Sequence, residues 1–291
     1  MIIRSIHFRP PTAMTGLVAL ALVLCSCARS KPESKPANPP AAQPATTHAQ
    51  PPGRGPHWSY EGEAGPANWG KLDAKFVACA EGMSQSPIDI ASTAPVAGSG
   101  TKFSYRPSEL HVVNNSHLSD GINNGHTIQV NCPGGDTVTV GDKPYSLVQF
   151  HFHSPSEHTV DGKHAAMEMH LVHKSADGAL AVLGVLIEEG AENAAFAPIW
   201  NNLPAGKDEE KHYSDVLYDI NALLPADHSV YRYDGSLTTP PCSEGVSWMV
   251  LRTPIQMSAD QVGKFRMHIN GNNRPVNPLN GRVVQQMSIG N

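Results

Sequence analysis

Two segments of this sequence place histidines at strand spacing, and together they limit both the fold and the chemistry of the chain. The first is Gln149-Phe150-His151-Phe152-His153. Side chains alternate between the two faces of a strand, so Gln149, His151 and His153 share one face. The apolar residues Val148, Phe150 and Phe152 are then expected on the opposite face.

The second segment is Glu168-Met169-His170-Leu171-Val172-His173, which reads as a neighbouring antiparallel strand. The same alternation places Glu168, His170 and Val172 on one face. Three imidazoles from two adjacent strands can converge on one point, and no carboxylate or cysteine offers an obvious fourth ligand. That donor set is typical of a catalytic zinc site whose fourth position holds water.

Hydrogen-bonding side chains precede two of these histidines by two positions. Gln149 and Glu168 lie on the same strand faces as His151 and His170, where they could fix the imidazole tautomers that zinc ligands need. Two histidines on one strand are in themselves equally typical of partly exposed surface residues. The third histidine and the two supporting side chains favour the metal site.

The charge and the histidine content restrict the remaining function classes. The net charge of −5 argues against a nucleic-acid-binding protein, which would carry a basic face. The 15 histidines leave a periplasmic metal buffer as an alternative to a single catalytic site.

The N-terminus predicts export rather than a part of the fold. Basic residues precede an apolar stretch that is too short to span a bilayer comfortably, and Leu24-Cys25-Ser26-Cys27 follows. This resembles a bacterial lipoprotein signal over residues 1–26 with Cys27 lipidated. Cys25 is a poorer candidate, and an ordinary secretory signal is the alternative. We expect a periplasmic protein held at a membrane, the outer membrane, by its lipid alone.

Residues 27–56 are rich in proline and contain little that is apolar and larger than alanine, which predicts a disordered tether. The folded domain is expected over residues 57–291. Cys25 and Cys27 belong to the N-terminal segment, so the folded domain contains Cys79, Cys132 and Cys242. At most one intramolecular disulfide can form among these three, and the spacing does not choose the pair.

Short apolar runs separated by Gly, Pro, Asn and Asp predict a single, mostly β domain. Strands are expected at 112–113, 127–130, 137–140, 145–152, 165–172, 180–187 and 246–251. Short helices are expected at 194–202, 213–223 and 258–265.

Five separated motifs resemble those of the α-class carbonic anhydrases, in particular of the bacterial branch. They are Gln85 to Ile90, Asn123 to His126, Ser156 to His173, Gly235 to Pro241 and Asn273 to Pro275. The resemblance extends from about residue 57 to the C-terminus. It implies a twisted, mainly antiparallel central sheet with short peripheral helices.

The resemblance also implies the reaction, the reversible hydration of carbon dioxide to bicarbonate and a proton by attack of a zinc-bound hydroxide. His151, His153 and His170 would bind Zn2+. Gln149, Glu168 and a backbone carbonyl near Asn272 would support them. Thr238 would accept a hydrogen bond from the hydroxide and donate one to Glu157.

Further roles follow from the resemblance. An apolar substrate pocket would be formed by Val172, Val182, Leu237, Val246 and Trp248. His126 would carry the proton to solvent, and Tyr60, Asn124, Gln129 and Thr239 would order the intervening waters. Cys79 would pair with Cys242, leaving Cys132 as a free thiol.

The expected partners are carbon dioxide and bicarbonate, with sulfonamides and anions as inhibitors, while a homodimer is left open. Besides the metal buffer, a catalytically weak zinc-binding or adhesion module on the same scaffold is the alternative to an enzyme. The presence of all three histidines favours the enzyme.

Overall fold

The computed structural model describes residues 57–96, 102–105, 108–113, 126–132, 134–204, 206 and 209–287, with the backbone alone described at 108–113. The segments 1–26 and 27–56, and with them Cys27, lie outside these residues, as does Asn124. The predictions for them stay predictions. Among the described residues, no helix is both long enough and apolar enough to cross a bilayer.

Most of the described strands belong to one sheet of 13 strands. Its main path runs β12 (Glu210–Tyr218), β4 (Ser108–Val113), β5 (Gln129–Asn131), β7 (Lys143–His153), β10 (Met167–Lys174), β11 (Leu180–Glu189), β14 (Glu244–Leu251), β13 (Val230–Ser236), β16 (Val284–Met287) and β2 (Thr93–Pro95). Off this path, β3 (Lys102–Ser104) pairs with β6 (Thr137–Val140), β6 also pairs with β7, and β15 (Ile255–Met257) pairs with β11.

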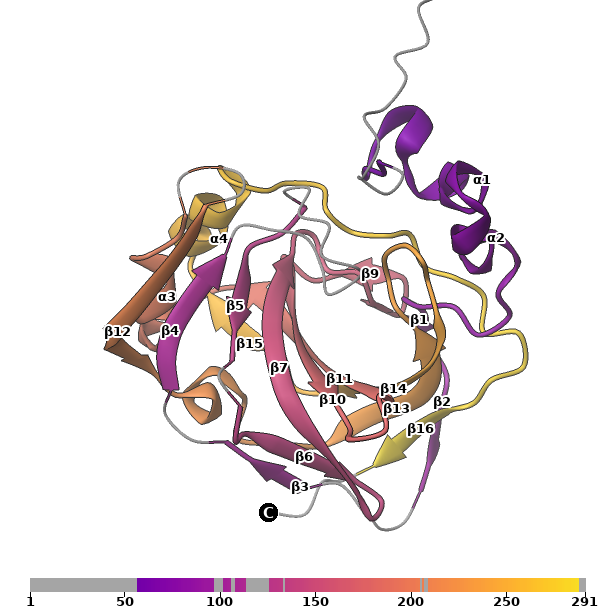
Figure 1. Cartoon of the computed structure of the whole chain (residues 1–291). Coiled ribbons are helices and arrows are strands. Elements are labelled where there is room, and N and C mark those ends of the chain that lie inside the picture. Colours follow the sequence, from indigo (N-terminus) through magenta and orange to yellow (C-terminus); the bar gives the residue numbers. More distant parts are fainter. Residues whose placement is uncertain are drawn as a thin grey trace, which may run out of the picture. The chain divides into compact units, whose positions relative to one another are not determined.

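Within the large sheet the pairing is antiparallel except between β11 and each of β14 and β15, and between β16 and β2. A small second sheet joins β1 (Asp89–Ile90), β8 (Thr159–Val160) and β9 (Lys163–His164). The mostly β, mainly antiparallel fold predicted from the sequence is therefore confirmed, and every predicted strand is present. Figure 1 shows β7 and β10 side by side in the middle of the large sheet.

The helices are short, as expected. The 3-10 helices, labelled η, are η1 (Gly62–Ala64), η2 (Pro66–Asn68), η3 (Ala74–Phe76), η4 (Ala194–Phe196) and η5 (Ile220–Leu223). The α-helices are α1 (Trp69–Leu72), α2 (Ala78–Glu81), α3 (Ala197–Trp200) and α4 (Ala259–Arg266). The predicted helix at 194–202 is divided into η4 and α3. The helix predicted at 258–265 is α4, where Ser258 and Gln261 form a capping box that supplies partners for the first N–H groups.

The helix predicted at 213–223 is wrong. Residues Glu210–Tyr218 form β12, and only the last four residues of the predicted segment are helical, as η5. The apolar residues of this segment recur at helical spacing, but its backbone pairs with β4 instead, with an irregularity between Tyr213 and Leu217. Pairing to a strand distant in sequence thus overrides the local pattern.

Alternate residues of β7 and β10 point to opposite faces of the sheet, with the larger hydrophobic core on one face and the three histidines on the other. Phe150, Phe152 and Leu171 are fully buried in the larger hydrophobic cluster, where the ring of Phe152 meets Trp200 of α3 edge-on at 5.0 Å. Val172 lies on the opposite face, in a second cluster with residues of β11 and β14. The histidine-bearing face is therefore backed by a packed core on its other side.

A disulfide joins Cys79, in α2, to Cys242, in the loop between β13 and β14. The resemblance implied this pair, and Cys132 is the free cysteine among the described residues. The Cys132 thiol lies 3.4 Å from the hydroxyl of Tyr218, and burial raises its pKa to about 12. Such a thiol stays protonated at neutral pH and is poorly reactive.

Candidate metal centre and its cavities

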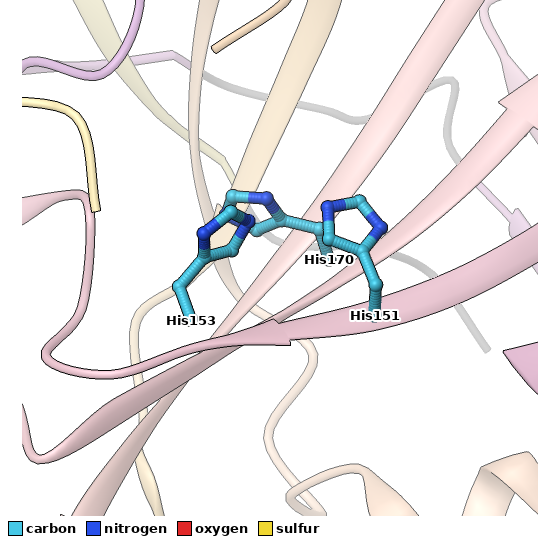
Figure 2. A group of neighbouring side chains, drawn as sticks. All are labelled: His151, His153 and His170. Carbon is cyan, nitrogen blue, oxygen red and sulfur yellow. The ribbon is translucent and has the colours of Figure 1, made fainter. Parts of the chain in front are cut away.

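The three predicted histidines come together on β7 and β10. In the antiparallel register His151 lies opposite His170, and His153 lies opposite Glu168. The three side chains are buried, and each offers a ring nitrogen within 4.8 Å of the other two. Figure 2 shows the three rings gathered around one point, as the strand alternation predicts.

An oxygen atom lies within 2.9 Å of one nitrogen of each ring. His151 Nδ1 donates to the side-chain oxygen of Gln149 at 2.8 Å, and His153 Nδ1 donates to the backbone carbonyl of Asn272 at 2.6 Å. His170 Nε2 lies 2.9 Å from Glu168 Oε1. Because these acceptors require an N–H, the second nitrogen of each ring carries a lone pair that could bind a metal.

Glu168 is held on several sides. Its Oε2 accepts from the backbone N–H groups of Glu157 and His158 at 2.9 and 2.8 Å, and His158 Nδ1 lies 2.7 Å from its Oε1. Burial acts to raise the pKa of Glu168, but the nearby His158 and His170 hold this pKa well below its usual value. The carboxylate therefore stays ionised and fixed in position behind His170.

His153 and His170 have the protonation state that a metal requires. Burial lowers the pKa of His153 to about 4 and also lowers the pKa of His170. Neutral imidazoles with oriented lone pairs, a buried acceptor behind each ring and no cysteine among the ligands fit Zn2+.

Glu157 lies beside two of the ligands. Its carboxylate oxygens are 3.6 Å from His153 Nδ1 and 3.9 Å from His170 Nδ1, and it accepts from the backbone N–H of Arg274 at 2.9 Å. Burial raises the pKa of Glu157 to about 7, while His170, the Arg274 N–H and the Thr238 side chain act to lower it. Thr238 therefore lies close enough to act on the Glu157 carboxylate, and the hydrogen bond that the resemblance implies between them stays a prediction.

A cavity of about 240 Å³ opens beside His151 and His170. Its polar side is formed by these histidines with Gln149, Thr238 and Thr239, and Lys174 and Gly178 also line it. The rest of its wall is apolar and consists of Val148, Val172, Leu180, Val182, Leu237 and Trp248. Four of the five predicted pocket residues therefore line the cavity.

Val246 is buried in the same hydrophobic cluster as the wall residues Val172, Val182 and Trp248, but it does not itself line the cavity. The alternation prediction fails for Val148, expected on the face of Phe150, because the register of β7 and β10 is irregular at this point. Val172 pairs with Gln149 and the next residue, His173, pairs with Leu147, so Val148 is an extra residue in a β-bulge. Sequence alternation has no signal for a bulge, but it does place Leu180 on the same face as Val182, two residues later on β11, and this wall residue was missed.

His126 does not line this cavity. It lines a second cavity of about 290 Å³ together with Tyr60, His268 and Asn272, and its ring stacks on Trp58 with a centroid distance of 3.9 Å. Asn272 connects the two regions, because its side-chain amide donates to the His126 carbonyl at 3.0 Å while its own carbonyl holds His153.

The remaining predicted water-ordering residues are separated. Thr239 lines the first cavity and Tyr60 the second. Gln129 is buried on β5 opposite His151, donates a hydrogen bond to Asn131, and lines neither cavity. The waters themselves are not part of the structure, so the ordering role of these residues stays a prediction.

Comparison with known proteins supplies the context for this geometry. A family model described as "Eukaryotic-type carbonic anhydrase" matches residues 64–288. A carbonic anhydrase of Klebsiella pneumoniae is 49% identical over 236 residues, which covers 78% of this chain and 90% of that protein.

Solved structures agree with the sequence relatives. The α-carbonic anhydrase of Thermovibrio ammonificans, in complex with the inhibitor sulfanilamide, is 43% identical with a TM-score of 0.73, covering 80% of this chain and 100% of that chain. A carbonic anhydrase of Chlamydomonas reinhardtii in complex with acetazolamide is 36% identical with a TM-score of 0.66, covering 79% and 99%.

Proposed function

This chain is an enzyme that belongs to the eukaryotic-type (α) carbonic anhydrase family, and from that premise we propose that it hydrates carbon dioxide reversibly at a zinc ion bound by His151, His153 and His170. The observation that carries the proposal is the three ring nitrogens within 4.8 Å of one another, each ring oriented from behind by an acceptor. Carbonic anhydrase is itself the standard example of a three-histidine site in which zinc, when bound, supplies a water with a pKa of about 7.

The residues in front of the histidines select what can occupy the cavity. We propose that the Thr238 hydroxyl, which lines the cavity and acts on Glu157, donates its proton to that carboxylate and so offers its own oxygen as an acceptor toward the cavity. An oxygen that carries a proton fits there, and one without a proton does not. The apolar wall with Val172, Val182 and Trp248 then suits a small substrate without charge, such as carbon dioxide.

The test is a zinc assay beside stopped-flow hydration of carbon dioxide, with and without a chelator. We expect one tightly bound zinc per chain and activity that disappears on chelation. His170→Ala should lose both zinc and activity, because it removes one ligand of three. A His170→Ala protein that kept a full equivalent of zinc and hydrated carbon dioxide would contradict the ligand set.

The same measurements separate the alternatives. Several weakly bound zinc ions without turnover would favour a metal buffer. One tight zinc without turnover would favour a binding module on this scaffold.

His126 is proposed as the group that carries the proton to solvent, since an imidazole gains and loses a proton near neutral pH. Its support is its place in a cavity joined to His153 through Asn272. His126→Ala should slow turnover in weak buffer, and added imidazole should restore it. A turnover that does not depend on buffer in this variant would remove His126 from the role.

Sulfonamides are proposed to bind in the cavity beside His151 and His170, on the model of the relatives in complex with sulfanilamide and acetazolamide. Acetazolamide should therefore inhibit hydration. A homodimer stays a prediction that sedimentation velocity can test.

Export as a lipoprotein is proposed from the signal-like segment 1–26 and Cys27. Cys27→Ser should abolish incorporation of labelled fatty acid and release the protein from the membrane fraction. Normal processing with unchanged membrane retention in this variant would exclude the anchor.

A further inference from the structure

Lys174 is the one Lys, Arg, Asp or Glu among the described residues that line the cavity beside His151 and His170. It is the last residue of β10, and β10 pairs regularly with β11 along its whole length. Strand side chains alternate, so Lys174 shares the face of His170 and Val172. It stands roughly 13 Å from His170 along the strand, at the outer end of the wall that carries this ligand.

The side chain of Lys174 lies over the turn that follows β10. A Cβ atom placed on Gly178 would be 3.9 Å from Lys174 Cε, and both residues line the cavity. The turn is closed by backbone hydrogen bonds from Ser175 to Ala179 and from Gly178 to Ser175, both 2.9 Å long. The exposed ammonium group is therefore at the mouth of the cavity.

The acidic residue of this turn does not neutralise that charge. The Asp177 carboxylate binds Lys143 Nζ at 2.8 Å and accepts from the Ser175 hydroxyl at 2.5 Å. Within the described parts of the chain, no carboxylate forms an ion pair with Lys174. Its positive charge thus acts on the cavity and on whatever approaches it.

The substrate and product of the proposed reaction differ in charge. Carbon dioxide is neutral and is not attracted by an ammonium group, whereas bicarbonate is an anion. The chain as a whole carries a net charge of −5, which repels anions at long range. A local positive charge at the mouth therefore discriminates between the two.

We propose that Lys174 is a specificity-determining residue that raises the affinity of this cavity for monovalent anions, bicarbonate included, relative to neutral ligands. The proposal rests on the proposed function insofar as bicarbonate is its physiological anion. It predicts binding of small inorganic anions whether or not the protein turns over carbon dioxide.

The experiment measures binding of thiocyanate to the zinc-loaded protein by calorimetry, with phenol as a neutral ligand in parallel. At low ionic strength, Lys174→Gln should raise the thiocyanate Kd about 3-fold and Lys174→Glu about 10-fold, from the Coulomb energy of a charge some 13 Å away in a partly aqueous medium. The phenol Kd should stay the same. Raising the ionic strength with sulfate should shrink the effect, because the distance exceeds the Debye length of about 10 Å at 0.1 M.

Lys264→Gln is the matched control, since it removes the same charge from α4, whose residues do not line this cavity. It should leave the thiocyanate Kd close to that of the unsubstituted protein. An equal shift in both Lys→Gln variants, an equal loss for phenol, or an effect independent of salt would each overturn the proposal. Failure of the proposed function is seen separately, as absence of hydration in a protein that binds zinc, because the calorimetric signal does not depend on turnover.

Discussion

Gly184, on β11 directly opposite His170, leaves room for the carboxylate that supports this ligand. A Cβ atom at this position would lie 2.9 Å from Glu168 Oε1 and 3.4 Å from Val250. Glu168 is fixed by two backbone N–H groups and by His158, so it cannot move aside without losing them. The site therefore depends on the absence of a side chain at a residue that offers no metal-binding atom of its own.

Gly184→Ala should weaken zinc binding about 10- to 100-fold, because displacing Glu168 disturbs the orientation of His170. It should also lower the free energy of unfolding by about 1–3 kcal/mol through overpacking. Competition with a chelator measures the first effect and urea unfolding the second.

The control for this substitution is Gly263→Ala in α4, where an added Cβ meets nothing within 4 Å. It should leave zinc affinity unchanged and stabilise the protein by up to about 1 kcal/mol, since alanine favours a helix over glycine. Equal zinc affinity in both variants would show that Gly184 is not needed for the site.

At the scale of elements, strand alternation places the metal ligands but not every wall residue of the cavity. It holds along β10 and from Gln149 to His153, where the three histidines share a face. It fails at the bulge, which turns Val148 from the predicted core face to the cavity. A bulge depends on how two strands pair, so the sequence of one strand does not reveal it.

Arg274 joins three segments that are far apart in the sequence. Its guanidinium donates to the carbonyls of Cys79 and Ser86 and to the side chain of Gln85, at 2.7–2.9 Å, and its backbone N–H donates to Glu157. Burial lowers the pKa of Arg274 to about 10, so the group stays charged at neutral pH. Two of the motifs quoted from the sequence therefore meet at this guanidinium.

Arg274→Met should lower the free energy of unfolding by about 3 kcal/mol, because it leaves several buried acceptors without a donor. Zinc should still bind, since the backbone N–H that holds Glu157 remains. Arg266→Met is the control, because Arg266 is exposed and its hydrogen bonds to Ser154 and Ala166 are accessible to water. It should cost less than about 1 kcal/mol in the same urea titration. Equal losses of unfolding free energy in the two variants would contradict a stabilising role of the Arg274 hydrogen bonds.

At the scale of the whole molecule, His173 couples folding to pH. It is fully buried on the core face of β10, where its Nε2 lies 3.0 Å from the Tyr105 hydroxyl. Burial lowers its pKa to about 4, against an ordinary value near 6.5. The unfolded chain therefore takes up a proton at this residue between pH 6.5 and 4 while the folded chain does not, so stability falls as the pH falls through this window.

Between pH 7.5 and 5 this residue should account for a loss of about 2 kcal/mol of unfolding free energy. Urea unfolding of the zinc-loaded protein and of His173→Gln at both pH values measures it, with the other titrating groups common to both proteins. The variant should lose about 2 kcal/mol less than the parent over this interval. Parallel losses would show that His173 is not the group responsible.

The sequence was sufficient to predict the three histidines that come together, the neighbouring side chains Gln149 and Glu168, and the mostly β architecture, because the two-residue period of a strand is a local property. The motifs identified the family, and the disulfide followed from that resemblance. The first group of features can be predicted from a few consecutive residues, and the family and the disulfide from whole motifs that match a known family.

Which of the predicted residues share a cavity depends on the tertiary structure. It made β12 from a segment with helical spacing, put Val148 in the cavity wall, and placed His126 in a second cavity, where Asn272 bonds both the His126 carbonyl and His153. It also put Lys174 at the mouth. Each of these outcomes depends on strand pairing or on contacts between segments distant in sequence, and such contacts leave no periodic signal in the chain that makes them.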